Sequence, residues 1–433
     1  MKFIHTADWH LGNRMYGINR YEEYADFFIW LKNEIEKQNA GTLIVSGDIY
    51  DTTNPPVESR TQYIDFLSSL KDTCCKNVII IGGNHDSAAL LNSEKSILEF
   101  SGIHVVGSIA NIKTDDMIFD LYDGDGNVSA VCCAVPYARE AELRRFFDGD
   151  AEDGTFSDKA YGKLYADILE RAKIKRGEKD IPIIATGHLY AANLEGRLEN
   201  FSSEKKSDDG TRLLDVVGNL GSVHSSVFQD DFDYVALGHI HYATMVNKNP
   251  KIRYSGSPFV MGFDEANVRH NILSVEIDGN HNASVEKIPV PDTFCYRRIS
   301  GRTMDIIDEL LKYKKNPPEK KTYVEAYFVQ EDGVSIHDEI ELIESSLPEN
   351  VSVVNKKAQP ALSESASEYS SVDMDELKNF DETEIFKRLI LTKEKDLYAD
   401  LNEDEQKKKK DDLIEKYLPL FQMIASEVEG EIN

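Results

Sequence analysis

The chain has 433 residues, of which 41% are hydrophobic, and its formal net charge is −28. This length exceeds what one hydrophobic core usually holds and predicts two or three structural units. No stretch approaches the roughly 20 apolar residues that span a membrane, and the opening MKFIHTADW contains no apolar signal segment, so we expect a cytoplasmic protein.

Residues 1–287 alternate apolar runs with amphipathic stretches. The runs MKFI, GTLIV, NVIIIG, IPIIA and DYVAL predict buried strands, and stretches such as YEEYADFFIWLKNEIEKQNA and ESRTQYIDFLSSLKDTC predict helices. NILSVEIDG and ASVEKIPV predict a closing hairpin across GNHN. The alternation predicts a layered α/β domain.

Seven potential metal ligands occur in five short segments, placed where strands should end. Open α/β sheets bind ligands at the carboxyl ends of their strands, so we expect these side chains to converge at one edge. Carboxylate, amide and imidazole groups can together hold two divalent cations, and two cations at one site favour phosphoryl-ester hydrolysis. The candidate ligands are Asp8, His10, Asp48, Asn84, His188, His239 and His241.

The spacing of these residues suits a pair of ions. Asp48 follows a buried strand and a glycine, so its carboxylate can bridge two ions about 3.5–4 Å apart. Asp8 and His10 are two residues apart, as are His239 and His241. In an extended strand such residues point to one face, so we expect each pair to hold a single ion.

Glycines precede most of the ligands by one or two residues and permit a tight turn with close backbone approach. They are Gly47, Gly83, Gly187 and Gly238. Imidazole suits zinc, manganese or iron, whereas carboxylate and amide oxygens suit manganese or magnesium. The mixture favours two Mn²⁺ ions and leaves iron, zinc and magnesium open.

The pattern changes between residues 288 and 358. TFCYRRIS, TYVEAYFVQ and NVSVVNKK predict strands, and TMDIIDELLKYKK and SIHDEIELIESSLP predict helices between them, which together indicate a small α+β domain. Its basic residues gather near the element ends, and the loop KYKKNPPEKK is a candidate phosphate contact. A solvated surface loop is the alternative. The DNA-binding candidates are Arg14, Arg297, Arg298, Lys314, Lys315, Lys320 and Lys321.

The last part of the chain has a different composition. Residues 359–372 are rich in Ser, Ala and Glu and predict a flexible linker. Residues 373–433 contain two helical stretches, and the second carries an apolar stripe that so short a helix pair cannot bury alone. The stripe therefore packs either on a partner or back on the first domain. The partner-binding candidates are Leu413, Tyr417, Leu418 and Phe421.

The segments HTADWHLG, SGDIYD, GGNHD, TGHL and GHIH resemble those of the calcineurin-like metallophosphoesterase superfamily. Within it, HTADWHLGNRMYG and SGDIYDTTNPP closely resemble the SbcD family of bacterial DNA double-strand-break repair nucleases. The resemblance is strong over the first two thirds of the chain. It implies a four-layer metallophosphoesterase β-sandwich flanked by helices, a capping domain at 288–358 that positions DNA, and a helical segment at 373–433 that binds the coiled coil of an SbcC-type ATPase.

The resemblance also implies a role for each site residue. His85 would lie beside the scissile phosphate and stabilise or protonate the leaving oxygen, and Asp86 could orient its imidazole. The alternative is that His85 only supports the ligands. Asp48 would bridge the two ions. One ion would have the ligands Asp8, His10 and His241, and the other would have Asn84, His188 and His239.

The implied function is that of the nuclease subunit of an SbcCD-type complex, nucleoid-associated and active in DNA repair, recombination and replication. It would use two metal ions as a 3′–5′ exonuclease on double-stranded ends and as an endonuclease on hairpins and single strands. The chain contains no G-x-x-x-x-G-K-[ST] loop, so the ATPase must be a partner. Helices near 57–70 and 88–100 would form a homodimer, unless their apolar residues face their own sheet.

The net charge of −28 fits poorly with a polyanionic substrate, because phosphates are usually contacted by Lys and Arg. It favours an alternative within the same superfamily, a phosphatase or cyclic-nucleotide phosphodiesterase that acts on a small substrate. A non-enzymatic metal-bound scaffold is a second alternative, and an intact His85 argues against it.

Overall fold

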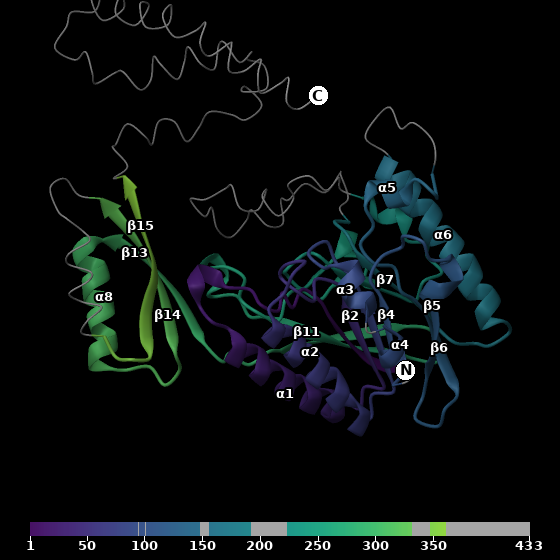
Figure 1. Cartoon of the computed structure of the whole chain (residues 1–433), viewed down its shortest axis with the longest axis horizontal. Coiled ribbons are helices and arrows are strands. Elements are labelled where there is room, and N and C mark those ends of the chain that lie inside the picture. The colour runs from purple at the N-terminus through teal and green to yellow at the C-terminus, as the bar shows by residue number, and fades with distance from the viewer. Residues whose placement is uncertain (94, 100, 148–155, 192–222, 331–346, 361–433) are drawn as a thin grey trace, which may run out of the picture. The chain divides into compact units, whose positions relative to one another are not determined.

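The computed structural model describes residues 1–93, 95–99, 101–147, 156–191, 223–330 and 347–360 (Figure 1). The chain divides into two units, Met1–Gln359 and Pro360–Asn433, and the fold below is that of the first. The predicted helical segment at 373–433, nearly all of the predicted linker, and the candidates Leu413, Tyr417, Leu418 and Phe421 lie outside the described residues. None of the helices in the described ranges is long and apolar enough to cross a membrane.

The first sheet contains six strands in the order β12-β11-β1-β2-β3-β4, and strands β1 to β4 are parallel. The two strands β11 and β12 form the predicted antiparallel hairpin, and β11 pairs antiparallel with β1. The strands of this first sheet are β1 (Lys2–Thr6), β2 (Thr42–Ser46), β3 (Asn77–Ile81), β4 (Ile103–Val106), β11 (Asn271–Ile277) and β12 (Ala283–Pro289).

The second sheet also has six strands, in the order β5-β6-β7-β8-β10-β9. Strands β6, β7, β8 and β10 are parallel, and β5 and β9 pair antiparallel at the two edges. Its members are β5 (Ile118–Tyr122), β6 (Val128–Cys133), β7 (Ile183–His188), β8 (Tyr234–Gly238), β9 (Thr244–Met245) and β10 (Ile252–Tyr254).

The side chains of the first sheet alternate between two cores, as a strand period of two requires. Phe3 and Ile44 belong to the core that the two sheets share, whereas Ile4 and Leu43 belong to the core beneath the helices. The predicted α/β fold with two sheets between helical layers is confirmed. The helices beside the first sheet are α1 (Tyr21–Gln38), α2 (Val57–Ser69), α3 (Ala88–Ser93) and α4 (Lys95–Glu99). Those beside the second sheet are α5 (Glu140–Leu143) and α6 (Phe156–Arg176) (Figure 1).

A third sheet lies in the predicted capping segment. It has the order β13-β14-β15, with β13 parallel to β14, and a small core around Ile306 of α8 and Val324 of β14. The three predicted strands and the first predicted helix are found, and the second predicted helix lies outside the described residues. The elements are β13 (Cys295–Arg302), α8 (Thr303–Lys315), β14 (Thr322–Gln330) and β15 (Val351–Pro360).

Trp9 anchors the chain that leaves β1 in the helical layer. Its side chain is fully buried, and its indole ring makes edge contacts with Phe27 and Phe28 of α1 and Phe66 of α2, at centroid distances of 6.1, 5.2 and 5.8 Å. The indole Nε1 donates a hydrogen bond of 3.0 Å to Oγ1 of Thr6. The residues on either side of Trp9 are both predicted metal ligands, so this anchor fixes where they emerge.

We predict that Trp9→Ala lowers the free energy of unfolding by about 3–5 kcal/mol, because it leaves a large cavity among packed rings. Urea unfolding followed by circular dichroism measures this loss. Trp30→Ala removes the other tryptophan, which is only partly buried on α1, and should cost clearly less. Equal losses in the two variants would contradict the anchoring role.

Candidate metal centre

Several of the predicted ligands lie in turns that follow the strands. Asp8 and His10 come after the end of β1 and have φ angles of 55° and 45°, and His239, directly after β8, has a φ of 99°. The extended geometry predicted for these pairs is therefore wrong. Asp48 also has a positive φ, 49°. Such backbone costs of order 1–3 kcal/mol for each non-glycine residue and is typical of functional sites.

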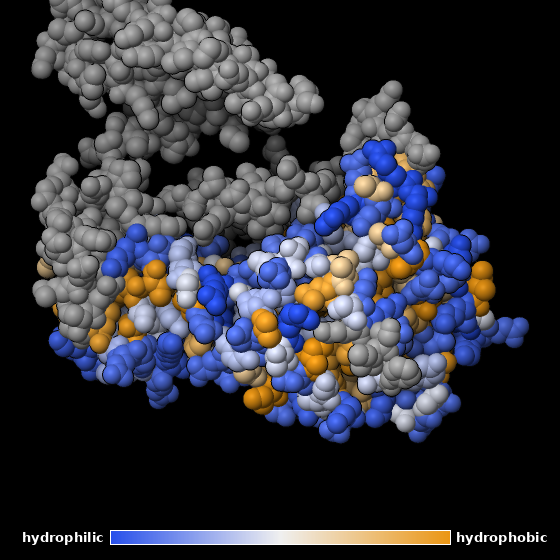
Figure 2. All heavy atoms as spheres, in the orientation of Figure 1, coloured by the Kyte–Doolittle hydropathy of each residue, from blue (hydrophilic) through white to orange (hydrophobic). Residues whose placement is uncertain are grey.

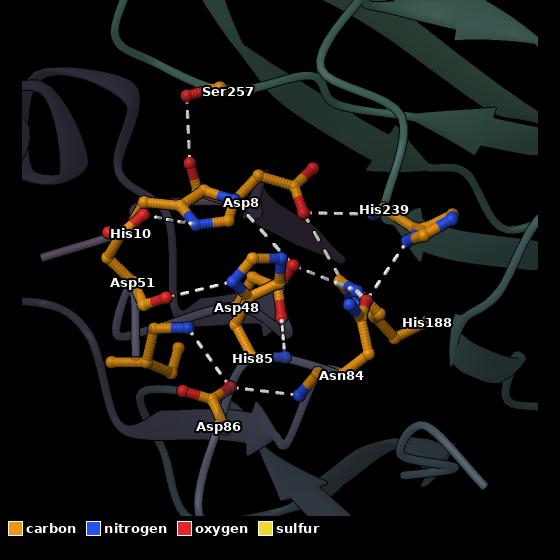
Figure 3. Close-up of polar contacts among 12 residues, drawn as sticks. Asp8, His10, Asp48, Asp51, Asn84, His85, Asp86, His188, His239 and Ser257 are labelled. Atoms are coloured by element: carbon orange, nitrogen blue, oxygen red, sulfur yellow. Dashed lines mark hydrogen bonds and ion pairs between the residues drawn. The ribbon is translucent and has the colours of Figure 1, made fainter. Parts of the chain in front are cut away.

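The turns bring the ligands of both sheets to one point (Figure 3). Asp48 lies in the middle: its Oδ2 is 3.2 Å from Nε2 of His188 and 3.6 Å from Nε2 of His10. Oδ1 of Asp8 accepts a hydrogen bond of 2.9 Å from the backbone N–H of His239. Strands β1 and β2 of one sheet and β7 and β8 of the other thus deliver these residues to a common edge.

Two groups of ligands can be distinguished around Asp48. Ligand atoms of Asp8, His10 and His241 all lie within 4.8 Å of one another. On the other side, Oδ1 of Asn84 lies 3.0 Å from Nε2 of His188 and 3.1 Å from Nδ1 of His239. All seven predicted ligands therefore gather at one place, which is the convergence that the sequence predicted.

The donor atoms at this place suit a divalent cation. Oδ2 of Asp8, Nε2 of His10 and Nε2 of His239 are buried and have no hydrogen-bond partner among the described residues. A buried polar atom without a partner costs about 1–3 kcal/mol. A bound cation would satisfy these atoms, and mixed carboxylate, amide and imidazole donors suit such an ion.

Burial and neighbouring charges set the protonation of the ligands. Burial lowers the pKa of His239 and of His241 to about 3, so both imidazoles are neutral near pH 7. Burial raises the pKa of Asp8 to about 6. Burial opposes a charge on His188, but the Asp48 carboxylate outweighs this effect and raises the His188 pKa to about 9. A cation that binds at His188 would have to displace this proton.

Gly83 and Gly47 allow the strand ends to approach one another. A Cβ on Gly83 would collide with the carboxylate and the backbone nitrogen of Asp48. Gly47 has a φ of 93°, and a Cβ there would collide with the ring of His188. The predicted close backbone approach is therefore found at both positions.

His85 lies at the exposed face of the site. Its backbone N–H donates to Oδ1 of Asp48 at 3.0 Å, and its ring is 4.8 Å from the ring of His10. Its Nδ1 lies 2.8 Å from the backbone carbonyl oxygen of Asp51. A carbonyl can only accept a hydrogen bond, so Nδ1 carries the hydrogen and Nε2 stays available.

Asp86 does not orient His85, contrary to our expectation. Its carboxylate is buried and accepts backbone hydrogen bonds from Gly83 (2.9 Å), Ile49 (3.1 Å) and Tyr50 (2.9 Å). Asp86 therefore holds the two loops after β2 and β3 together, and the Asp51 carbonyl orients His85.

Asp51 is a site residue that the sequence analysis missed. Its Oδ1 lies 3.3 Å from Nδ1 of His10 and accepts a hydrogen bond of 3.0 Å from Nδ2 of Asn13. Its signal was present in the segment GDIYD, where a second carboxylate follows Asp48 by three residues. Ser257, whose Oγ donates to the Asp8 carbonyl at 2.8 Å, gave no signal in the sequence.

The DNA-binding candidates differ in their surroundings. Arg298 is engaged within the capping segment, since its Nε lies 2.8 Å from Oε2 of the fully buried Glu325. Arg14 is exposed and lines a cavity of about 290 Å³ that also includes Asn13. The remaining candidates are exposed: Arg297, Lys314, Lys315, Lys320 and Lys321.

The sequence model of the calcineurin-like phosphoesterase family matches residues 1–243. This match covers more than half of the chain, and the chain belongs to that family. It is similar to the D subunit of the nuclease SbcCD of Escherichia coli strain K12, with 29% identity over 368 residues, which are 83% of this chain and 86% of the relative. The corresponding SbcCD subunit of Bacillus subtilis strain 168 is 28% identical over 292 residues, 66% of this chain and 69% of the relative.

These comparisons confirm the resemblance predicted from the motifs. They also identify the chain as a metal-dependent phosphoester hydrolase by family, in agreement with the gathered ligands. Among solved structures, a β-glucosidase from Exiguobacterium marinum covers 83% of this chain and 89% of its own, but with 10% identity and a TM-score of 0.19 the likeness is too slight to bear on the fold.

We predict that Gly83→Ala lowers the affinity for Mn²⁺ at least tenfold, because the added methyl group displaces the Asp48 carboxylate. Isothermal titration calorimetry measures the affinity. The matched control is Gly162→Ala in α6, where an added Cβ meets no atom within 4 Å. Wild-type affinity in Gly83→Ala would show that Asp48 does not need its present position.

Proposed function

We propose that the chain is the nuclease subunit of an SbcCD-type complex and hydrolyses DNA phosphodiester bonds at a site with two divalent metal ions, held by the ligands gathered around Asp48. The convergence of seven ligands from both sheets, with buried atoms that lack partners among the described residues, carries this proposal. The relatives are named as nuclease subunits, which supports a nucleic acid as the substrate. The proposed activities are 3′–5′ exonuclease on double-stranded ends and endonuclease on hairpins and single strands.

The ligand groups suggest how the ions would be held. Asp8, His10 and His241 would bind one ion, Asn84, His188 and His239 the other, and Asp48 both. When bound, a metal pair activates water and neutralises charge on the phosphate. Mn²⁺ fits this donor set, and iron, zinc and magnesium remain alternatives.

His85 would act on the leaving oxygen. The Asp51 carbonyl holds its Nδ1–H, so Nε2 can carry a proton towards the substrate. Its ring is exposed beside that of His10, so a phosphate held at the ligands would be within its reach. No serine or cysteine nucleophile is required.

We predict that His85→Ala lowers kcat about 10²- to 10⁴-fold on labelled duplex and hairpin DNA with Mn²⁺, because a general acid is removed. Its Mn²⁺ affinity should stay within about threefold of the wild type, since His85 is not one of the groups that orient or hold the ions. Asp8→Ala is the comparison variant and should lose both metal and activity. Loss of metal in His85→Ala would refute the role assigned to His85.

The capping segment would supply contacts to DNA. The exposed lysines 314, 315, 320 and 321 lie at the end of α8 and in the loop before β14. Nζ of Lys321 lies 5.8 and 5.4 Å from the ring centroids of Phe294 and Tyr323, so these cation–π contacts hold its ammonium group in place. A basic cluster on one loop would offset the acidity of the whole chain near the substrate.

We predict that changing these four lysines to glutamate weakens duplex binding and reduces the slope of log affinity against log salt by about one for each phosphate that is no longer contacted. Fluorescence anisotropy at several salt concentrations measures both. Four exposed lysines outside the capping segment, Lys37, Lys71, Lys113 and Lys179, provide a charge-matched control. An equal effect in the two variants would mean that these lysines act only through the overall charge of the chain and do not contact DNA.

A phosphatase or cyclic-nucleotide phosphodiesterase is the second candidate, and the net charge of −28 favours it. Activity of the wild type on bis-p-nitrophenyl phosphate without cleavage of labelled duplex DNA would decide for this alternative. A scaffold without enzymatic activity would hydrolyse neither.

Assembly with other chains is also proposed. An SbcC-type ATPase would bind residues 373–433, and loss of co-purification on their deletion would support this. A homodimer would form through the helices near 57–70 and 88–100, yet Tyr63, Leu67 and Leu91 are at most 3% exposed within the chain's own core. Figure 2 shows separate hydrophobic patches on a mostly hydrophilic face, some near α2 and α3, and light scattering of the purified chain tests the dimer.

A further inference from the structure

A series of polar contacts leads from the metal centre to the beginning of α1. The first member is the Asp51 carboxylate, 3.3 Å from Nδ1 of His10. The negative charge of the carboxylate favours a hydrogen over a lone pair on Nδ1, which leaves the Nε2 lone pair facing the other predicted ligands. Both ring nitrogens of His10 are buried, and neither makes a hydrogen bond among the described residues, so the contact with Asp51 is electrostatic and Nε2 is free to bind a cation.

Asn13 connects Asp51 to Arg20. Its Nδ2 donates to Oδ1 of Asp51 at 3.0 Å, and its Oδ1 accepts from Nη1 of Arg20 at 3.3 Å. Only this orientation of the amide satisfies both neighbours, because the reverse would face its NH₂ group towards the guanidinium and its oxygen towards the carboxylate. The two end groups therefore fix the Asn13 side chain.

Arg20 is buried between a carboxylate and three aromatic rings. It is 1% exposed, and its Nε donates to Oε2 of Glu23 at 2.6 Å. Its guanidinium lies 5.6, 5.5 and 5.8 Å from the ring centroids of Tyr24, Phe259 and Tyr296. Tyr296 belongs to β13 of the capping segment, and its hydroxyl donates to Oε2 of Glu23 at 3.2 Å.

Stability alone does not explain a buried arginine at this place. Burial disfavours its charge, but the Glu23 carboxylate outweighs that effect and keeps the pKa of Arg20 above its ordinary value. Nη2 is buried without a hydrogen-bond partner among the described residues. Apolar residues of similar volume often stabilise a fold as well as a buried ion pair does, so the guanidinium is better explained by what its Nη1 holds.

We propose that Arg20 is a positioning residue of the metal centre. Through Asn13 it fixes the Asp51 carboxylate, which holds the His10 imidazole in the tautomer and orientation that bind a divalent cation. Tyr24 supports the same loop, since its hydroxyl donates to the backbone carbonyl of His10 at 3.0 Å. The proposal rests on the proposed function only in requiring that the gathered ligands bind divalent cations.

The test begins with Asn13→Ala in the full chain. Asn13 is half-buried, so this change removes the link between Arg20 and Asp51 without opening the buried arginine site. The affinity for Mn²⁺, measured by isothermal titration calorimetry, should fall about 10- to 100-fold, as for other groups that orient a metal-binding histidine. Thermal unfolding of the metal-free protein should change little.

Asn77→Ala is the matched control. Asn77 is 2% exposed at the start of β3, the end of the strand opposite to the ligands, and its Nδ2 donates to the Gly41 and Tyr122 carbonyls and to Oγ1 of Thr42. Its loss should lower the melting temperature and leave the Mn²⁺ affinity unchanged. The two asparagine variants thus separate a positioning role from a structural one.

Arg20→Lys keeps the charge but loses the forked geometry that reaches Glu23 and Asn13 together. It should weaken Mn²⁺ binding in the same direction, and adding it to Asn13→Ala should weaken binding little further, because both changes break one series of contacts. Effects that multiply in the double variant would mean that Arg20 does not act through Asn13, and would overturn the proposal.

Wild-type Mn²⁺ affinity in Asn13→Ala would also overturn the proposal. A wild-type chain that binds no Mn²⁺ would refute both this role and the two-metal function. Reduced Mn²⁺ affinity in Asn13→Ala, together with uncut duplex DNA in the wild type, would support the role of Arg20 and refute the nuclease proposal alone.

Discussion

The carboxylate of Asp48 is the charge around which the metal centre is arranged. Its Oδ2 contacts imidazoles from both sheets, those of His10 and His188, and its Oδ1 accepts the backbone N–H of His85. Burial alone would raise its pKa, but the neighbouring imidazoles, His188 foremost, hold that pKa well below its usual range. An ionised carboxylate in such surroundings is stable only with cationic partners, so the turns after four strands must meet at this one point.

The positions of these turns follow from the packing of the two sheets. Alternate residues of the first sheet enter separate cores, and past the end of β1 Trp9 inserts its ring among the aromatic side chains of α1 and α2. The backbone on either side of Trp9 adopts positive φ at Asp8 and His10, which is unfavourable in isolation. The buried ring offsets that cost, and the site is therefore an extension of the hydrophobic core as much as a collection of ligands.

Much of this site was predictable because its signals are local. Most of the predicted ligands come shortly after an apolar run, as Asp48 does in GTLIVSGD, and parallel strands bring such positions to one edge. The sign of φ at Asp8 and the partners of Asp86 were not predictable, because both depend on loops distant in sequence. The ion pair of Arg298 was not predictable either, because its partner Glu325 is distant in sequence. Glu325 lies on the neighbouring strand, and only the register of β13 with β14 brings the two residues together.

The acidity of the chain is less of an obstacle to a polyanionic substrate than its total suggests. Exposed charges are largely screened beyond about 8–10 Å at physiological salt, so the groups near the ligands decide how a phosphate approaches. Several cations farther away are engaged by carboxylates, as Arg171 is by Asp115 and Asp167. At the centre itself, divalent ions would reverse the sign of the local potential that Asp8 and Asp48 create. At the start of α1 the charge of Arg20 is neutralised by Glu23 and adds nothing to this balance. Arg20 matters there through its contacts: because it touches Tyr296 of the capping segment as well as Asn13, a displacement of that segment would disturb the contacts that reach His10.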